Sequence, residues 1–159
     1  MQRDPSRKKI RLPLPVYDTK RTASVTIGTH LRRPWFSCFP EFSDRALEIL
    51  NKSALDSDAR LFAWCIMPDH VHLLVECENL AGFVRRFKGR ATVAARSVDP
   101  DRRLWQRSFY DHLLRGDEDV LTVVRYIWGN PVRAGIVRKP GEYRWSGSAV
   151  WADWRAFFG

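Results

Sequence analysis

The sequence predicts an α+β fold of the ferredoxin-like class: a split β-α-β sheet with helices on one face and an added C-terminal helix. Three observations predict it. Segments with strand-like and helix-like hydrophobic spacing follow one another in the order β-α-β-β-α-β, and a last helix follows them. The 159 residues are enough for one ordinary domain, and 45% of them are hydrophobic, which supplies a core. No internal repeat or low-complexity tract interrupts this order.

The start of the chain is expected to stand apart from that domain. Residues 1–20 are rich in lysine and arginine and have no sustained hydrophobic period, and Pro5, Pro13 and Pro15 interrupt any regular element. We therefore expect a flexible basic arm over residues 1–20 and a single domain over residues 21–159.

The first half of the domain is expected to contain three strands and a helix. Residues 24–30 are rich in strand-forming side chains, and residues 42–55 carry apolar side chains at helical spacing. Residues 61–67 are apolar on both faces, as expected of a central strand. Pro68-Asp69 then supplies a turn into residues 70–77, so these two strands should pair as a hairpin.

The second half is expected to contain two helices and one strand. Residues 80–98 keep a 3.6-residue apolar period with most arginines off the stripe, which predicts an amphipathic helix with a basic outer face. Residues 107–115 are a predicted strand that Gly116 ends. Three acidic residues, 117–119, favour the start of the last helix, and Asn130-Pro131 is expected to end it.

The charge of the chain predicts a polyanionic partner. Lysine and arginine number 27 against 18 aspartate and glutamate, a formal charge of +9 that attracts nucleic acid before any specific contact forms. A solvated basic surface is the alternative. The helix 80–98 carries four residues that we expect to hold nucleic-acid phosphates, together with the N-terminal arm. They are Arg85, Arg86, Lys88 and Arg90.

The cysteines and the apolar runs indicate the cellular compartment. Cys38, Cys65 and Cys77 are odd in number and lack CxxC spacing, so neither a disulfide framework nor a thiolate zinc site is expected. A reducing cytoplasm fits this pattern. The longest apolar run, residues 61–67, is far too short to cross a bilayer, so we expect no membrane partner.

Two histidines begin a candidate metal site. His70 and His72 are two residues apart on a predicted strand, so both imidazoles share one face and the apolar Val71, Leu73 and Val75 share the other, which should face the core. Two neutral imidazoles are a start on a divalent metal site that needs further ligands. The alternative is a pair of surface or hydrogen-bonded histidines.

The last helix adds two candidates. Its buried stripe runs through Val120, Val124 and Ile127, so Tyr126 lies on the polar side. Asn130 projects one turn further on and could offer an amide oxygen to a metal. The alternative is a boundary tyrosine followed by an asparagine that ends the helix.

These residues stand in segments that resemble a known family. Residues 67–72 (MPDHVH), residues 126–137 (YIWGNPVRAGIV) and residues 143–146 (YRWS) look like the REP-associated tyrosine transposases, which belong to the single-tyrosine HUH nucleases. The likeness runs from the first strand to Ser148. Gly147 departs from it, because relatives often have a second serine there, and Gly129 is unusual inside its motif.

The resemblance implies the chemistry of the site. By position, His70 and His72 match the metal histidines, Tyr126 matches the nucleophile, and Asn130 matches a residue that can complete metal coordination. The implied cofactor is Mg²⁺ or Mn²⁺. The implied activity is a single-stranded DNA endonuclease and strand-transferase that forms a 5′-phosphotyrosine.

The resemblance also implies a substrate and an assembly. The implied partner is single-stranded or hairpin DNA, with palindromic repeats as the substrate class and a monomer or homodimer as the acting form. Unpaired bases are expected to stack on an aromatic side chain such as Trp35 or Trp105.

Other interpretations stay open. A DNA-hairpin-binding protein of the same fold without cleavage is one. A nucleotide hydrolase of the histidine-triad type is another interpretation, although such an enzyme requires a third histidine where this chain has Leu74. Tyr110 is a rival nucleophile and His112 a rival ligand, because both lie on one face of a predicted strand.

Overall fold

The computed structural model describes residues 18–158. The expected order of elements is confirmed over this range. The arm predicted over residues 1–20 lies outside the described residues except for its last three. There Thr19–Arg21 form one 3-10 turn that leads into the sheet.

The sheet has five antiparallel strands in the order β4-β1-β3-β2-β5. The strands are β1 (Thr22–Gly28), β2 (Arg60–Met67), β3 (His70–Glu76), β4 (Tyr110–Leu113) and β5 (Ser146–Gly147). Strand β3 lies between β1 and β2, which is the split β-α-β arrangement that the sequence predicts. Strand β5 adds a fifth position beside β2.

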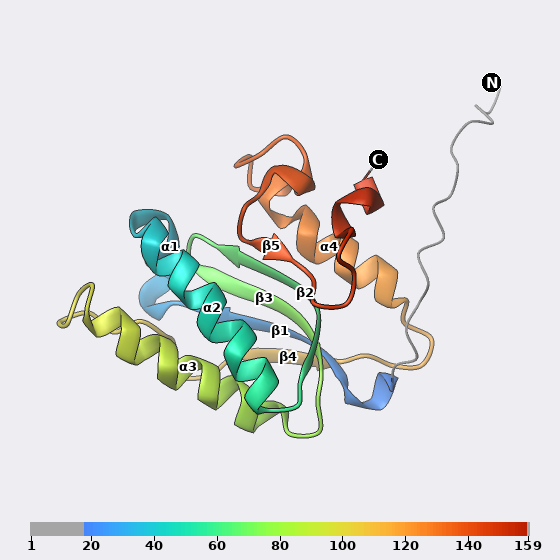
Figure 1. Ribbon diagram of the computed structural model, residues 1–159, viewed down its shortest axis with the longest axis horizontal. Helices are drawn as coiled ribbons and strands as arrows, with labels where there is room; N and C mark the ends of the chain where they lie inside the picture. Colours follow the sequence, from blue (N-terminus) through green and yellow to red (C-terminus); the bar gives the residue numbers. More distant parts are fainter. Residues whose placement is uncertain (1–17, 159) are drawn as a thin grey trace.

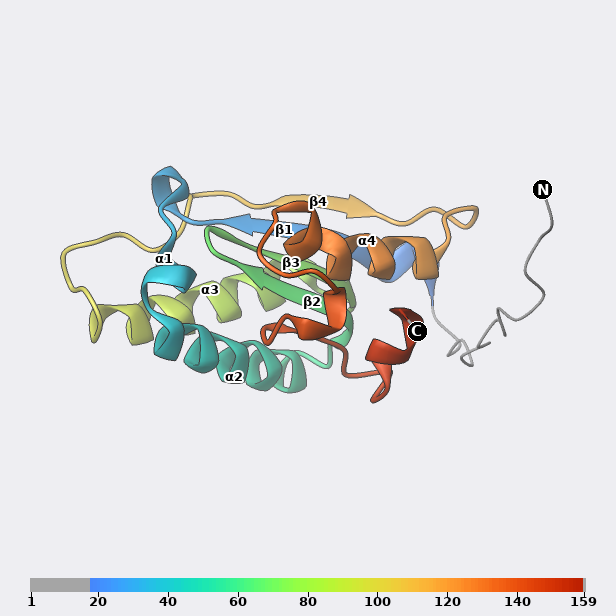
Figure 2. The same cartoon turned by 90° about the horizontal axis from the view of Figure 1, so that it is seen from above.

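The helices lie on both faces of the sheet. They are α1 (Trp35–Cys38), α2 (Pro40–Asp56), α3 (Leu80–Arg96) and α4 (Val120–Arg133), with short 3-10 turns at His30–Arg32, Pro140–Glu142 and Trp154–Phe158. Helices α2 and α3 pack side by side on one face (Figures 1 and 2). Helix α4 packs against β2 and β3 on the other face. The predicted ferredoxin-like fold with an added helix is confirmed.

Alternation along the strands builds two cores. Val71, Leu73 and Val75 of β3 pack with α2 and α3, whereas Leu74 packs with α4 and the C-terminal segment. A bulge in β2 changes which of its side chains face each core, since the register of β2 with β3 shifts between Leu61 and Ala63. Strand β2 therefore supplies both cores, as its apolar residues on both faces predict.

Strands β1 and β4 differ most from the predicted boundaries. Strand β1 ends at Gly28 rather than at residue 30, because the chain turns out of the sheet at Thr29, whose hydroxyl lies 2.7 Å from the Arg33 carbonyl and 2.9 Å from the Asp69 carbonyl. Strand β4 spans only Tyr110–Leu113, and its four residues are exposed at the sheet edge. An edge strand with few buried contacts gains little stability from additional residues, so it stays short.

The predicted end of the last helix at Asn130-Pro131 is wrong. Helix α4 continues through Pro131 to Arg133. A proline has no N–H for the carbonyl four residues earlier, which here belongs to Ile127. The side-chain amide of Asn130 donates to that carbonyl at 3.1 Å. The asparagine thus supplies the missing hydrogen bond and lets the helix pass the proline.

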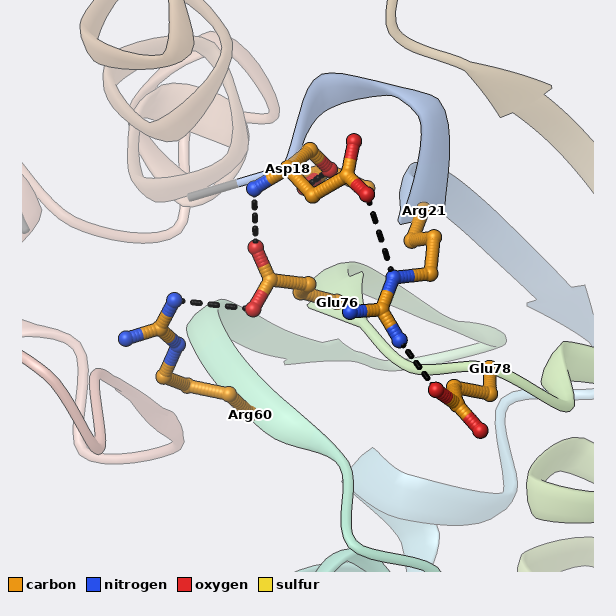
Figure 3. A network of polar contacts seen from close by, with 6 residues as sticks. Asp18, Arg21, Arg60, Glu76 and Glu78 are labelled. Carbon is orange, nitrogen blue, oxygen red and sulfur yellow. Dashed lines mark hydrogen bonds and ion pairs between the residues drawn. The ribbon is translucent and has the colours of Figure 1, made fainter. Parts of the chain in front are cut away.

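A polar network fixes the chain where it enters the sheet (Figure 3). The Glu76 carboxylate accepts from the backbone N–H of Asp18 at 2.7 Å and from the Arg60 guanidinium at 2.8 Å. Arg21 donates to Asp18 and to Glu78. The network lies at the last residue of β3, which is the opposite end of that strand from the two histidines.

Neither a membrane helix nor a disulfide occurs in the described part of the chain. Within residues 18–158, every helix is too short or too polar to cross a bilayer. Cys38 is exposed and Cys65 and Cys77 are buried, all three as free thiols.

Candidate metal and tyrosine site

The two imidazoles lie on the sheet face that α4 covers. His70 and His72 are the first and third residues of β3, and Val71 between them belongs to the core under α2 and α3. The imidazoles therefore point to the opposite face, as the alternation predicts. Their ring centroids are 4.6 Å apart and the ring planes are perpendicular.

Each imidazole has a partner at its Nδ1 atom. The Nδ1 of His72 is 3.0 Å from the hydroxyl of Thr26, the residue opposite it on β1. The Nδ1 of His70 is 2.5 Å from a carboxylate oxygen of Asp69, whose other oxygen is 3.2 Å from Nε of Arg32. When Nδ1 carries the proton and donates it, Nε2 of each ring keeps its lone pair. Metal-binding histidines are commonly oriented in this way.

The turn that carries Arg32 has an unusual backbone. Leu31 and Arg32 have φ of 54° and 53°, in the left-handed region that side-chain-bearing residues rarely adopt. This conformation places the Arg32 guanidinium on the Asp69 carboxylate. Strained backbone that supports a candidate site is a common arrangement in proteins.

The electrostatics keep His72 neutral. Burial lowers the pKa of His72 to about 4, and the nearby His70 and Arg133 act in the same direction. The ring is therefore uncharged near pH 7. Neutral imidazole is the form that binds metal ions.

The donor set fits a divalent metal in part. Asn130 uses its amide nitrogen on the Ile127 carbonyl, so its amide oxygen is the atom that can serve as a ligand. Among residues 18–158, no cluster of three histidine, cysteine or acidic side chains is present. Two imidazole nitrogens and one amide oxygen, with water or phosphate in the other positions, suit Mn²⁺ better than Mg²⁺, which prefers oxygen ligands.

Tyr126 lies on the same side of the sheet as the imidazoles. Val120, Val124 and Ile127 bury one face of α4 against β2 and β3, and Tyr126 on the other face is 59% exposed. Helix α4 runs with its C-terminal end toward the turn between β2 and β3 (Figure 1). The phenol therefore stands on the helix that covers the histidine face.

Arg133 contacts Tyr126 directly and was not identified from the sequence. Its guanidinium carbon lies 4.0 Å from the centroid of the Tyr126 ring, and Nη2 donates to the Tyr126 carbonyl. The same charge contributes to the lowered pKa of His72. A separation of seven residues, two helical turns, is the sequence signal that could have found it.

The other tyrosines differ in their surroundings. The Tyr143 hydroxyl is buried and donates to the Ile66 carbonyl at 2.6 Å, which is a structural role. Tyr110 is 74% exposed and lies opposite Thr26, which lies opposite His72, so it shares their face of the sheet. Tyr110 stays a rival nucleophile. The rival ligand His112 is 2.9 Å from Glu118.

Three of the four predicted phosphate-binding residues have partners within the chain. Arg86 donates to the Ser57 hydroxyl at 2.8 Å, and Arg90 pairs with Asp56 at 2.7 Å, so both tie α3 to the end of α2. Lys88 donates to the Gln106 carbonyl at 2.8 Å. Arg85 is exposed and lines a hollow.

That hollow is a basic concave surface. It lies between α3 and residues 100–109 and has a volume of about 720 Å³. Six basic side chains line it: Arg85, Lys88, Arg96, Arg102, Arg103 and Arg107. Backbone hydrogen bonds connect the hollow to the candidate site. The carbonyl of Leu104, which lines the hollow, accepts from the N–H of His30, and the neighbouring Thr29 donates its N–H to the carbonyl of Asp69, the residue before His70.

The structure corrects one expectation and explains two features of the sequence. Trp35 and Trp105 are 2% and 4% exposed, so the expected stacking of bases on them is wrong. A Cβ atom at Gly147 would lie 2.4 Å from the Trp64 ring, so the serine that relatives often have does not fit here. Leu74 is fully buried where a histidine-triad enzyme wants its third imidazole.

The chain is similar to known proteins in both sequence and fold. Residues 21–130 match the family model described as "Transposase IS200 like". A Haemophilus influenzae protein provisionally named a REP-associated tyrosine transposase is 33% identical over 98 residues, which cover 53% of this chain and 56% of that protein. The Escherichia coli K12 REP-associated tyrosine transposase is 26% identical over 95 residues, with 57% and 55% covered. The chain thus spans a little over half the length of these relatives.

Solved structures share the fold. One is a REP-associated tyrosine transposase bound to a REP hairpin, with a TM-score of 0.66, 22% identity, and coverage of 85% of this chain and 81% of that one. Another is a provisionally named transposase from Deinococcus radiodurans, with a TM-score of 0.52, 24% identity, and coverage of 73% and 95%. At these identities the likeness establishes the arrangement of the sheet and helices.

Proposed function

The chain belongs to the IS200-like transposase family, and on this premise we propose that it cleaves and rejoins single-stranded DNA at a hairpin, with Tyr126 as the nucleophile. The observation that carries the proposal is the placement of an exposed tyrosine on the helix that covers the face of both imidazoles. The resemblance to REP-associated tyrosine transposases, now supported by family membership and by the matched relatives, gives the substrate class.

The proposed step exchanges one phosphate ester for another. The Tyr126 hydroxyl oxygen forms a bond to the scissile phosphorus, and the bond from phosphorus to the 3′ oxygen breaks. The phenol gives up one proton and the departing 3′ oxygen takes one up, so the step is balanced. The products are a 5′-phosphotyrosine and a free 3′-hydroxyl. A second 3′-hydroxyl can reverse the step on another strand, which is strand transfer.

His70 and His72 are proposed as the metal ligands, with Asn130 as a third. A bound Mn²⁺ or Mg²⁺ would polarise the scissile phosphate and offset the charge that develops on it. The chain's own contribution is orientation. Thr26 and Asp69 hold the two rings through Nδ1, and the Asn130 amide is held by its hydrogen bond to Ile127.

The basic hollow between α3 and residues 100–109 is proposed to bind the DNA backbone. A groove with six basic side chains attracts phosphates without reading sequence. Of the residues predicted from sequence, Arg85 and Lys88 line this hollow, whereas Arg86 and Arg90 are occupied by α2. The backbone link from Leu104 through Thr29 and His30 to Asp69 connects the hollow to the metal histidines.

A covalent-adduct assay tests the proposal. A DNA hairpin with a single-stranded flank is labelled at its 5′ or its 3′ end and incubated with the protein and Mn²⁺. We expect the 3′ label to become covalently attached to the protein and the 5′ label to leave on a shorter strand with an extendable 3′-hydroxyl. Tyr126→Phe, His72→Ala or chelation of the metal should abolish both products.

The controls separate the proposal from its alternatives. Tyr110→Phe should cleave like the wild type, because Tyr110 is only the rival nucleophile. Binding of the hairpin with no adduct in the wild type would favour a DNA-binding protein without cleavage. An adduct that survives in Tyr126→Phe would assign the chemistry to another residue.

A further inference from the structure

We infer that Arg133 is a positioning residue for Tyr126, and that position 129 is a glycine because the Arg133 side chain passes over it. The chemical role of Arg133 rests on the proposed function of Tyr126. The contact itself does not, because it is a feature of the protein without DNA.

Three contacts define the path of the Arg133 side chain. Its guanidinium carbon lies 4.0 Å from the Tyr126 ring centroid, within the range of a cation–π contact. Its Nη2 donates to the Tyr126 carbonyl. A Cβ atom built at Gly129 would lie 2.7 Å from its Nη1. The guanidinium therefore lies in the space that any other residue at position 129 would fill.

The positions follow from helix geometry. Residues 126, 129 and 133 are separated by three and four residues, so all three lie along one side of α4. Glycine destabilises a helix interior relative to alanine. Its presence one turn before the helix end is accounted for by the room that it leaves for the guanidinium.

The contact would restrain a side chain that is otherwise free. Tyr126 is 59% exposed and points away from the buried face of α4, so its ring lies outside both hydrophobic cores of the described residues. A planar guanidinium on one face of the ring limits its rotation, and it places a positive charge where the DNA phosphate has to arrive. A lysine would keep the charge and lose the planar stacking.

Three variants test the inference: Gly129→Ala, Arg133→Lys and Arg133→Ala. The first readout is the NMR signal of the Tyr126 ring in protein with labelled tyrosine and no DNA, which we expect to shift in all three. The second is the single-turnover rate of adduct formation, which we expect to fall about 10- to 100-fold in each, since small displacements of a reacting group have effects of this size. Gly129→Ala should do so while its thermal stability is equal to or above that of the wild type.

The double variant makes the test sharper. If Gly129 acts through Arg133, the pair Gly129→Ala and Arg133→Ala should react at the same rate as Arg133→Ala alone. Rates that fall further in the double variant, or wild-type rates in Arg133→Lys or Gly129→Ala, would overturn the inference. So would an unchanged Tyr126 ring signal.

Two matched controls complete the design. Arg125→Lys changes an arginine on the same helix whose guanidinium lies 5.9 Å from the Phe157 ring, and Gly116→Ala adds a Cβ where no atom lies within 4 Å. Both should react like the wild type. If the wild type forms no adduct at all, the proposed function fails and the role of Arg133 in it fails too, whereas the NMR readout still decides whether the contact exists.

Discussion

The two imidazoles of β3 are held by different kinds of partner. His70 is held by the carboxylate of the residue before it, Asp69, which Arg32 holds in turn. His72 is held by a hydroxyl on the neighbouring strand, Thr26. Both partners occupy Nδ1, so the orientation of the two Nε2 atoms depends on residues other than the proposed metal ligands.

If His70 and His72 bind a metal as proposed, Thr26→Val should weaken that binding while both proposed ligands stay in place. Valine has the shape of threonine but no hydroxyl, so the His72 ring loses the partner that fixes its orientation. Loss of such a partner typically costs about 10- to 100-fold in metal affinity. Isothermal titration with Mn²⁺ measures the change.

Thr22→Val is the matched control, since Thr22 lies on the same strand and its hydroxyl donates to the backbone carbonyl of Asp18. It should lower stability and leave the Mn²⁺ affinity unchanged. Equal Mn²⁺ affinity in Thr26→Val and the wild type would show that His72 does not need its Nδ1 partner.

At the scale of elements, one side chain of α4, Asn130, both replaces a missing helical hydrogen bond and is a candidate metal ligand. Pro131 leaves the Ile127 carbonyl without its helical partner, and the amide of Asn130 supplies one at 3.1 Å. This hydrogen bond stabilises the last turn of the helix and therefore the position of Arg133 beside the histidine face.

The cost of Asn130→Ala should therefore depend on Pro131. In the wild-type background we expect the free energy of unfolding to fall by about 1 kcal/mol, the usual net value of one hydrogen bond. In a Pro131→Ala background the restored N–H takes over the Ile127 carbonyl, so the same change should cost close to nothing. Denaturant unfolding of the four proteins measures both costs.

The same cost of Asn130→Ala in both backgrounds would contradict this account of the helix end. Asn130→Asp provides a second comparison, because it keeps a ligand oxygen and removes the donor to Ile127. It should lose stability as Asn130→Ala does.

Local patterns predicted the elements well, and the site only in part. Alternation alone predicted that His70 and His72 face away from Val71, and helical spacing alone predicted an exposed Tyr126. These follow from one element at a time. The Thr26 partner of His72 required the register between two strands, which no local pattern contains.

The wrong predictions depended on contacts that the local sequence does not contain. Asn130-Pro131 predicts a helix end, but the Asn130 side chain replaces the N–H that Pro131 lacks, and the helix continues. Trp105 was expected to stack on bases, but it pairs with Thr29 and is buried in the core. The path of Arg133 over Gly129 likewise needs the side-chain conformation.

At the scale of the whole molecule, the sheet separates two layers with different roles. One face carries α2 and α3 and the basic hollow, and the other carries the imidazoles and α4. Part of the excess positive charge of the chain thus lies in the hollow, on the other face of the sheet from the two histidines. A DNA strand bound in the hollow would approach the histidines through the turn at Thr29 and Asp69.

The salt dependence of DNA binding tests this division. Changing Arg85, Arg96 and Arg107 together to alanine removes three charges from the hollow. A plot of log affinity against log salt concentration has a negative slope, and this slope should become shallower by about 2, given about 0.7 per phosphate contact on single strands. Fluorescence anisotropy with a labelled hairpin at several salt concentrations measures the slope.

A variant with the same loss of charge elsewhere is the control. Arg45, Arg144 and Arg155 lie on exposed positions outside the hollow, and their joint change to alanine should alter the slope much less. Equal slopes for the two triple variants would mean that the net charge of the protein, rather than the hollow, binds the backbone.

The most direct test of the central claim is to identify the tyrosine that becomes linked to DNA. Trypsin separates the two candidates, because Tyr126 falls in the peptide 126–133 and Tyr110 in the peptide 108–115. After reaction of the wild type with a hairpin and Mn²⁺, mass spectrometry of the digest should find the 5′-phosphate of the DNA on peptide 126–133. Linkage to peptide 108–115, or cleaved DNA with no linked peptide, would contradict the account.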